Sequence, residues 1–359
     1  MQDVIVVGAS IAGLSTANEC AKKGLKTTVI EEHARLGVPV KCSGLYSKRI
    51  CKLAGINKSF AEHSIRGAIF HAPSGYSFEI KKTGVAAYVV DRAKLDRHVA
   101  GEAVRNGANI IANARFDSLK STDNGIAVKT SKTVLKTKLV AGCDGANSRV
   151  SGYVDPSQTK KLHGMIAITN QEDYSDFVDL YFDNKKYPGF FAWKIPRGAT
   201  TEYGVAASVE HAANAFRGFL KENNVKKHST LSGMIPMGLK KTYAERIVLV
   251  GDAACQVKPL TGGGVIYSLI CSRIAANAFR DAITQNRFDE SFMKRYEDEW
   301  KKQISGNIRL GLAMRGLYSL MPNWQIDAAL RLLGFAPARK LIEKFGDMDF
   351  TLKLGAHGV

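Results

Sequence analysis

Short apolar runs rich in β-branched residues recur along the chain and predict buried strands. The first run, at 3–7, is followed by a glycine-containing turn, a segment at 14–23 with helical spacing, and a second apolar run at 27–30. Strands that alternate with helices in this way are typical of an α/β sheet. Similar strands are predicted at 87–90, 138–142 and 247–250, and an amphipathic helix is predicted after Asp91-Arg92.

The turn after the first strand is spaced like a dinucleotide-binding fingerprint. It reads Gly8-Ala9-Ser10-Ile11-Ala12-Gly13, with Ser10 in place of the second glycine. Gly8 permits the tight turn, and Gly13 lets the helix pack closely on the strand. A pyrophosphate would lie at the helix N-terminus, where Ser10 still offers its N–H, and Glu31 is placed to bind ribose hydroxyls.

A second glycine-rich turn follows the strand at 247–250. Gly251-Asp252 ends this strand, and Gly262-Gly263-Gly264 leads into a helix that begins at Val265. The N–H groups of a bare helix N-terminus suit an anion, and the glycines let a flat group approach the main chain. Asp252 could accept hydrogen bonds from sugar-alcohol hydroxyls. An ordinary loop with glycines for turn geometry is the alternative.

The strand at 138–142 ends in a related way, with Asp144-Gly145. Two strands therefore each deliver an Asp and a Gly to a loop. Because open α/β sheets bind ligands at the carboxyl ends of their strands, this pattern predicts one ligand-binding edge.

Residues 156–235 differ in character from the rest. Alternating and aromatic segments at 178–182, 189–195 and 203–208 predict an antiparallel sheet. Aromatic side chains lie on both faces of the segment 190–196, which contains Phe191, Trp193 and Pro196. Trp193 belongs either to an ordinary core or to an aromatic-walled slot for an apolar substrate.

Two other segments carry candidate chemistry. The loop 37–46 contains Cys42, the cysteine least like core filling because polar and turn residues surround it. From Phe292 onward the pattern is mostly helical, and apolar residues alternate with arginines near the end. This tail is either a helical cap on the core or a surface that rests on an anionic membrane.

Composition narrows the choice of partners. With 51 Lys and Arg against 33 Asp and Glu, the net charge is +18, which favours an anionic partner. The lysines are scattered, and no nucleic-acid motif or basic tail is present, so we expect no nucleic-acid partner. No CxxC pair occurs among the six cysteines, which argues against zinc and iron–sulfur sites. No signal peptide and no run of about 20 apolar residues is found, so a cytoplasmic location is expected.

Three stretches together resemble the FAD-dependent oxidoreductases of the para-hydroxybenzoate hydroxylase type: 8–13 with Glu31, 143–148, and 251–254 with 259–264. The resemblance implies FAD as the cofactor. It assigns the pyrophosphate to Ala12 and Gly13, the adenosine ribose to Glu31, and the ribityl chain to Asp252. The other cofactor contacts it implies are Arg92 at the phosphates or ribityl chain, Phe116 near adenine, Asp144, Gly251, and the N-terminal turn of the later helix with Gly263, Gly264 and Val265 near the flavin O2 edge.

Within that group, Lys41-Cys42-Ser43-Gly44, Phe191-Ala192-Trp193-Lys194-Ile195-Pro196 and Gly346-Asp347-Met348-Asp349 resemble the geranylgeranyl reductase family. The resemblance places Cys42 and Ser43 beside the flavin, and Phe191, Trp193 and Pro196 in the substrate wall. Phe191 stands where tyrosine is usual, and Ile195 stands where phenylalanine is usual.

This family resemblance implies an FAD-dependent reductase that saturates isolated double bonds of geranylgeranyl chains. Reduced flavin N5 would deliver hydride while the alkene is protonated, and Cys42 or Tyr46 would help to supply the proton or shape the site. The substrate would be an isoprenoid lipid or a prenyl diphosphate. The electron donor stays open between a nicotinamide, a ferredoxin and another carrier, because no second nucleotide fingerprint is found.

Flavin-dependent halogenases and monooxygenases acting on aromatic substrates are the alternative. The halogenases carry a related Trp-x-Trp-x-Ile-Pro segment and need a relay lysine, for which Lys81 or Lys82 could serve.

The predicted architecture is a Rossmann-like FAD-binding domain, an antiparallel β-sheet substrate domain and a C-terminal helical region. The FAD-binding domain is discontinuous and comprises 1–65, 88–155 and 236–285. The substrate domain comprises 66–87 and 156–235, and the helical region comprises 286–359.

Overall fold

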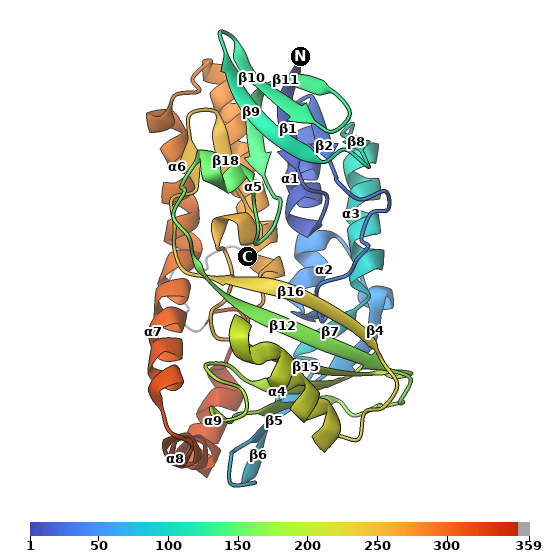
Figure 1. Ribbon diagram of the computed structural model, residues 1–359, viewed down its shortest axis with the longest axis vertical. Coiled ribbons are helices and arrows are strands. Elements are labelled where there is room, and N and C mark those ends of the chain that lie inside the picture. Colours follow the sequence, from blue (N-terminus) through green and yellow to red (C-terminus); the bar gives the residue numbers. More distant parts are fainter. Residues whose placement is uncertain (351–359) are drawn as a thin grey trace.

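The computed structural model describes residues 1–350 and is elongated, with two large sheets in opposite halves (Figure 1). The first sheet has eight strands, and its main path runs β17-β18-β11-β1-β2-β8. β1 is parallel to both β11 and β2, and β18 is parallel to β11. The strands are β1 (Gln2–Val7), β2 (Thr27–Ile30), β8 (Asn109–Ile111), β9 (Phe116–Thr122), β10 (Gly125–Thr130), β11 (Val134–Gly142), β17 (Tyr243–Ala244) and β18 (Ile247–Leu249).

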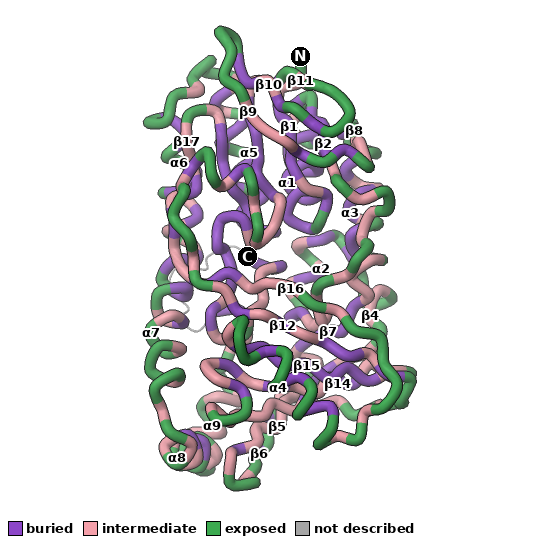
Figure 2. Tube along the Cα trace, viewed as in Figure 1, coloured by how far each residue is buried: buried purple, intermediate pink, exposed green. Residues whose placement is uncertain are grey.

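Three long helices pack beside this sheet. α1 (Ile11–Lys22) lies between α5 (Val265–Gln285) and α3 (Arg92–Arg105), and all three contribute to the largest hydrophobic core. The purple segments of Figure 2 show that β1, α1 and α5 are largely buried. α3 begins where Asp91 accepts hydrogen bonds from the N–H groups of Ala93 and Lys94, at 2.8 and 3.1 Å. The shorter α2 (Arg49–Ala54) also packs against α5.

The second sheet has seven strands in the order β16-β12-β15-β14-β13-β5-β6. Neighbouring strands are antiparallel except for β13 and β5, which are parallel. α4 (Val209–Glu222) packs against β15 and β12. The strands are β5 (Gly67–His71), β6 (Ser77–Lys81), β12 (Lys160–Thr169), β13 (Phe177–Tyr181), β14 (Ala192–Pro196), β15 (Thr201–Ser208) and β16 (Ser229–Met237).

The loop that contains Cys42 leads into a small third sheet. Its order is β3-β7-β4, and all its pairs are antiparallel. The strands are β3 (Leu45–Ser47), β4 (Ala61–Ile65) and β7 (Ala87–Val90), with a 3₁₀ turn at Lys58–Phe60. Further 3₁₀ turns occupy Val150–Tyr153 and Gly251–Ala254.

The C-terminal helices run from one half of the molecule to the other along one side (Figure 1). α6 (Glu290–Trp300) continues through a π-helical turn (Lys301–Ser305) into α7 (Gly306–Leu320). α8 (Asn323–Gly334) and α9 (Ala336–Phe345) follow. Residues 346–350 return to the first half, where Arg49 donates to Asp347 and Asp349. The last part of the predicted helical region, 351–359, lies outside the described residues.

The α/β class, the second sheet and the helical C-terminal region are confirmed, but the second sheet is not wholly antiparallel as predicted, because β13 and β5 are parallel. The helix at α4, within a region predicted as strands, was missed. The predicted domain boundaries stay a prediction, although the strands of the seven-stranded sheet come from 66–87 and 156–235 apart from the last two residues of β16. None of the helices within residues 1–350 combines the length and the apolar character that a bilayer span requires.

Candidate functional site

The ends of three adjacent parallel strands bring the predicted glycine turns together. β18, β11 and β1 are neighbours in the sheet, so the turns that follow them share one edge. At Gly8, with φ of +99°, a Cβ atom would lie 2.6 Å from the Cys143 carbonyl oxygen, and at Gly13 it would lie 1.8 Å from the Gly8 carbonyl oxygen. A side chain at either position would therefore disrupt the turn.

Glu31 lies at the end of β2, directly beside the first glycine turn. Its carboxylate accepts hydrogen bonds from the Ala9 N–H at 2.7 Å and from the His33 N–H at 2.9 Å. A pocket of about 410 Å³ lies next to it, with His33 and Arg115 in its lining, and Phe116 follows Arg115 in the chain. This arrangement suits a ribose at Glu31 and a base in the adjoining pocket.

Arg92 places a positive charge at the N-terminus of α1. Its Nη2 donates to Ser10 Oγ at 2.6 Å, and its Nε donates to Asp96 at 3.0 Å. The guanidinium is only 10% exposed, so its charge is weakly screened. A cation beside helix N–H groups suits a phosphate, which is one of the two contacts, phosphates or ribityl chain, that the family resemblance implies for Arg92.

Asp252, at the start of the second glycine turn, has a half-buried side chain. Burial raises its pKa to about 6, against the opposing influence of Arg92. Within residues 1–350, no hydrogen-bond donor from the protein reaches this carboxylate. A Cβ atom at Gly264 would lie 2.9 Å from Asp252 Oδ1, so the glycine keeps the space beside the carboxylate open. Sugar-alcohol hydroxyls would satisfy the group, and the residues present therefore fit the ribityl chain of FAD.

The other residues of this turn form the N-terminus of α5. Gly264 is the N-cap, Val265 is the first helical residue, and no side chain caps the helix. Gly251 adopts φ of +71°, and a Cβ atom there would lie 2.9 Å from Ala12 Cβ. The free N–H groups at this end are available for an electron-rich ring edge.

Asp144, in contrast, is occupied within its own loop. Its carboxylate accepts hydrogen bonds from Ser148 Oγ at 2.5 Å and from the N–H groups of Arg149 and Val150 at 2.7 and 3.2 Å. Burial raises its pKa, and these bonds oppose the rise. These bonds give Asp144 a role in shaping the loop, and the cofactor contact that the resemblance implies stays a prediction.

The thiol of Cys42 pairs with a buried phenol. Cys42 Sγ lies 3.3 Å from Tyr46 Oη, and the Gly44 N–H donates to Sγ at 3.5 Å. Burial raises the pKa of Tyr46 well above its usual value, so the phenol stays protonated. Gly44 closes the turn with φ of +75°, and a Cβ atom there would lie 2.1 Å from the Val90 carbonyl oxygen. The two predicted catalytic residues therefore form one hydrogen-bonded pair.

The aromatic wall lies on β14 and the loop before it. Phe190 stacks on Phe191 with ring centroids 4.4 Å apart, and Phe191 meets Trp193 edge-on at 5.9 Å. Trp193 is half-buried, and its Nε1 donates to Glu202 at 2.8 Å. Pro196 is buried at the end of β14, opposite Thr201.

A buried ion pair joins this wall to the thiol loop, and the sequence analysis missed it. Arg197 Nη1 donates to the Ser43 carbonyl at 2.6 Å and to Glu202 at 3.0 Å. Thus Cys42, Ser43, Tyr46 and the wall belong to one site. In the sequence, only the Arg197-Gly198 pair after Pro196 marks this position. It does not indicate that Ser43 and Glu202 are the partners of Arg197.

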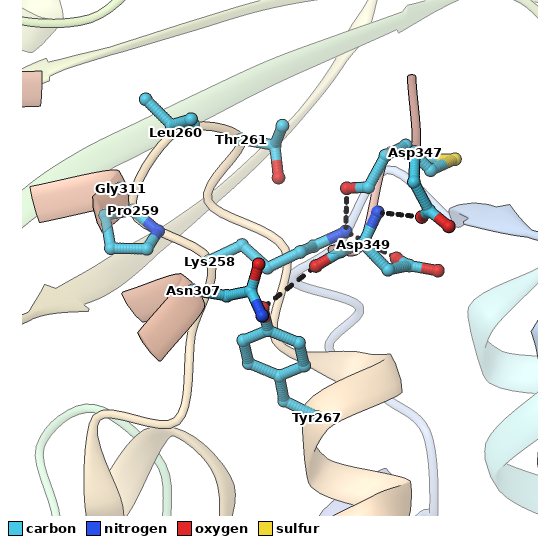
Figure 3. A pocket seen from close by; sticks show the side chains of 10 residues that line it. Lys258, Pro259, Leu260, Thr261, Tyr267, Asn307, Gly311, Asp347 and Asp349 are labelled. Atoms are coloured by element: carbon cyan, nitrogen blue, oxygen red, sulfur yellow. Dashed lines mark hydrogen bonds and ion pairs between the residues drawn. The ribbon is translucent and has the colours of Figure 1, made fainter. Parts of the chain in front are cut away.

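The Gly-Asp-Met-Asp segment at 346–349 contacts the second glycine turn through Lys258. Lys258 Nζ donates to the Met348 carbonyl at 3.1 Å and to Asp349 at 2.8 Å, and Tyr267 Oη donates to the Asp349 carbonyl at 2.9 Å (Figure 3). A pocket of about 110 Å³ lies between this segment, the 258–261 turn and α7. The contacts join residues 348 and 349 to the second glycine turn and to α5 despite their distance in sequence.

The two lysines considered for a halogenase relay serve other roles. Lys82 Nζ donates to the carbonyls of Ile342, Glu343 and Gly346 at the end of α9. Lys81 is exposed and lies over the Phe177 ring at 5.4 Å. No cluster of potential metal ligands is present within residues 1–350.

Comparisons with known proteins identify the family. The family model for the FAD binding domain matches residues 1–299. The digeranylgeranylglycerophospholipid reductase of Methanococcus vannielii is 30% identical over 324 residues, which cover 84% of this chain and 82% of that protein. The digeranylgeranylglycerophospholipid reductase 1 of Methanopyrus kandleri is 31% identical over 84% of this chain and 86% of its own length.

The solved structures agree on the fold. A geranylgeranyl bacteriochlorophyll reductase-like protein from Thermoplasma acidophilum superposes with a TM-score of 0.84 at 22% identity, covering 96% of each chain. A myxobacterial chondrochloren halogenase reaches a TM-score of 0.69 at 16% identity, over 97% of this chain and 93% of its own. The resemblance to geranylgeranyl reductases predicted from sequence is confirmed, and so is FAD as the cofactor. The chain belongs to the FAD-dependent oxidoreductases of the FAD binding domain family and, within them, to the digeranylgeranylglycerophospholipid reductases.

Proposed function

We propose that this protein saturates the isolated double bonds of geranylgeranyl chains in a polyprenyl lipid precursor, a phospholipid with two such chains being the favoured substrate. The observation that carries the proposal is the bridge from Arg197 to Ser43 and Glu202, because it unites the Cys42–Tyr46 pair and the Trp193 wall in one site. The relatives named above are reductases of a digeranylgeranyl phospholipid, which supports the substrate class.

The cofactor would be held along the shared sheet edge. Glu31 would bind the ribose, Arg92 and the 8–13 turn the pyrophosphate, and Asp252 the ribityl chain. The N-terminus of α5 would stabilise negative charge on the reduced ring. When bound and reduced, FAD supplies the two electrons, as hydride, for one carbon of the double bond.

The chain's own residues would handle the substrate and the proton. An isolated trisubstituted alkene is electron-rich, so positive charge develops at its tertiary carbon as it is protonated. The faces of Phe191 and Trp193 would stabilise that charge and exclude water. Tyr46 keeps its proton at neutral pH and lies 3.3 Å from the thiol, so the Cys42–Tyr46 pair would hold a proton at the site.

A membrane-facing surface is part of the proposal, because the substrate is a lipid. Nine of the sixteen exposed large apolar side chains within residues 1–350 lie between 314 and 345. α9 buries none of its residues, and cationic side chains accompany the apolar ones. We call the following set the apolar surface of α7–α9: Met314, Leu317, Leu320, Trp324, Leu332, Leu333, Phe335, Leu341 and Phe345. Together with the net charge of +18, this surface suits contact with an anionic bilayer.

The test measures lipid reduction without oxygen and, separately, NAD(P)H oxidation in the presence of oxygen and an aromatic compound. The FAD-loaded protein is reduced with dithionite without oxygen and given a digeranylgeranyl phospholipid, and the lipid is analysed by mass spectrometry. The proposal predicts a gain of two hydrogens for each bond reduced. An unchanged lipid, together with oxygen-dependent NAD(P)H oxidation stimulated by an aromatic compound, would instead favour a monooxygenase.

A further inference from the structure

Glu202 is a buried carboxylate between the Cys42 loop and the aromatic wall, and none of the sequence motifs described above includes it. The Glu202 side chain has no exposed surface. One oxygen accepts from Trp193 Nε1 at 2.8 Å, and the other accepts from Arg197 Nη1 at 3.0 Å. Burial raises the pKa of Glu202, and the charge of Arg197 opposes this rise. Both oxygens are thus committed to fixed partners.

Arg197 connects three separate parts of the chain. Its Nη1 donates to the Ser43 carbonyl at 2.6 Å as well as to Glu202, and its Nη2 donates to Glu62 on β4 at 2.6 Å. The Arg197 side chain is 11% exposed, whereas that of Glu62 is 38% exposed. A guanidinium is the side chain that can serve several acceptors in a fixed planar fork, and a lysine cannot reproduce these directions.

Strand register aims the indole at this carboxylate. Trp193 is opposite Gly204 and Ile195 is opposite Glu202 in the β14–β15 pair. Because Gly204 has no side chain, the Trp193 ring lies close against its backbone, and the ring nitrogen reaches Glu202 two residues away. Each link in the series Ser43–Arg197–Glu202–Trp193 is therefore a direct hydrogen bond.

Stability alone is a weak reason for such a pair. Replacing a buried ion pair with apolar residues of similar volume is often neutral or stabilising, because charges are costly to desolvate. A small misplacement of reacting groups, in contrast, can lower a rate by about 100-fold. We propose that Arg197 and Glu202 are positioning residues that fix the Cys42 loop against the Trp193 wall, so that the thiol and the substrate slot keep one relative placement. The catalytic meaning of this placement rests on the proposed function.

Two substitutions and a matched control test the proposal. Glu202→Gln keeps an acceptor for Trp193 but removes the ion pair, and Arg197→Lys keeps the charge but loses the fork. Glu62→Gln is the control, because it removes the charge of another acceptor of the same arginine, at its more exposed end. Two readouts are measured on FAD-loaded protein: the rate of Cys42 alkylation by iodoacetamide, followed by peptide mass spectrometry, and the steady-state constants for lipid reduction.

We expect Glu202→Gln and Arg197→Lys to change the Cys42 alkylation rate by at least about threefold and to lower kcat by about 10- to 100-fold, with KM within about threefold. Glu62→Gln should stay within about twofold of the unsubstituted chain in both readouts. If Glu202→Gln does not fold, the alkylation rate and kcat of Arg197→Lys alone test the positioning role. Alkylation rates and kcat that match those of the Glu62→Gln control would overturn the positioning role.

The alkylation readout is independent of the lipid reaction. If the alkylation rate changes as expected while no variant and no unsubstituted protein reduces the lipid, the positioning of Cys42 stands and the proposed function fails.

Discussion

The indole ring of Trp193 lies against the α-carbon of Gly204, the residue opposite it on the neighbouring strand. A Cβ atom built at Gly204 would lie 2.1 Å from the ring, which is far inside van der Waals contact. We therefore expect Gly204→Ala to displace Trp193 and to lower the free energy of unfolding by about 1–3 kcal/mol. Denaturant unfolding would measure this loss.

Gly218→Ala is the matched control for that substitution. Gly218 lies within α4, is exposed, and has nothing within 4 Å of a built Cβ atom. Alanine there should raise the free energy of unfolding by about 0.5–1 kcal/mol. Equal effects of the two substitutions would show that Trp193 is free to move away from Gly204.

Cys42→Ala tests the thiol. The variant loses the hydrogen bond to Tyr46 and should reduce lipid about 100-fold more slowly, while FAD stays bound. Turnover and the flavin absorbance of the purified variant are the measurements. Cys51→Ala, at a half-buried cysteine on α2, is the control and should leave turnover unchanged. Undiminished reduction by Cys42→Ala would remove the thiol from the reaction.

Asp252 should make FAD affinity depend on pH. Its pKa in the folded chain is raised to about 6 by burial, so the carboxylate takes up a proton as the pH falls through 6. Because hydroxyl groups donate best to the ionised form, FAD affinity should fall between pH 7 and pH 5. Titration followed by flavin fluorescence measures it, and Asp252→Asn should flatten the profile.

The same shift predicts a stability change in the FAD-free protein. A carboxyl group whose folded pKa exceeds its unfolded value binds more protons in the folded state, so stability falls as the pH rises from about 4 to about 6. Asp252→Asn should remove this part of the pH dependence. Parallel pH profiles for the variant and the unsubstituted chain, in both binding and unfolding, would contradict the assignment.

The apolar surface of α7–α9 should bind anionic vesicles. Replacing Leu317, Trp324 and Leu332 with Ser removes three exposed apolar side chains and should weaken binding to phosphatidylglycerol vesicles by more than about tenfold. Vesicle co-sedimentation measures this change. The control replaces Val134 and Tyr174, which are also exposed but lie far from this surface in sequence. Equal binding by both variants would exclude this surface as the membrane contact.

Local sequence patterns predicted most of the cofactor-binding half. The glycine turns after β1 and β18 were recognisable because a tight turn and a bare helix N-terminus need specific residues at fixed spacings. α4 was missed although its buried residues, Ala212, Ala215, Phe216, Phe219 and Leu220, recur at helical spacing. That periodicity could have identified the helix.

The side-chain contacts that assemble the site were not predicted from the sequence. Glu202 reads as a polar residue in an alternating strand, and only the register of β14 with β15 reveals that it meets Trp193. In the same way, the role of Lys258 depends on a segment about 90 residues later returning to it. The Lys258 contacts join segments that are distant in sequence and meet only in the folded chain.

Reduced flavin in this protein should be oxidised by an isoprenoid double bond. The most direct measurement is an anaerobic single turnover: the FAD-loaded protein is reduced, excess dithionite is removed, and flavin absorbance is followed after a digeranylgeranyl phospholipid is added. We expect reoxidation of the flavin with one double bond saturated per flavin, and no reoxidation with the fully saturated lipid. Flavin that stays reduced with the unsaturated lipid, but is reoxidised when oxygen is admitted, would contradict it.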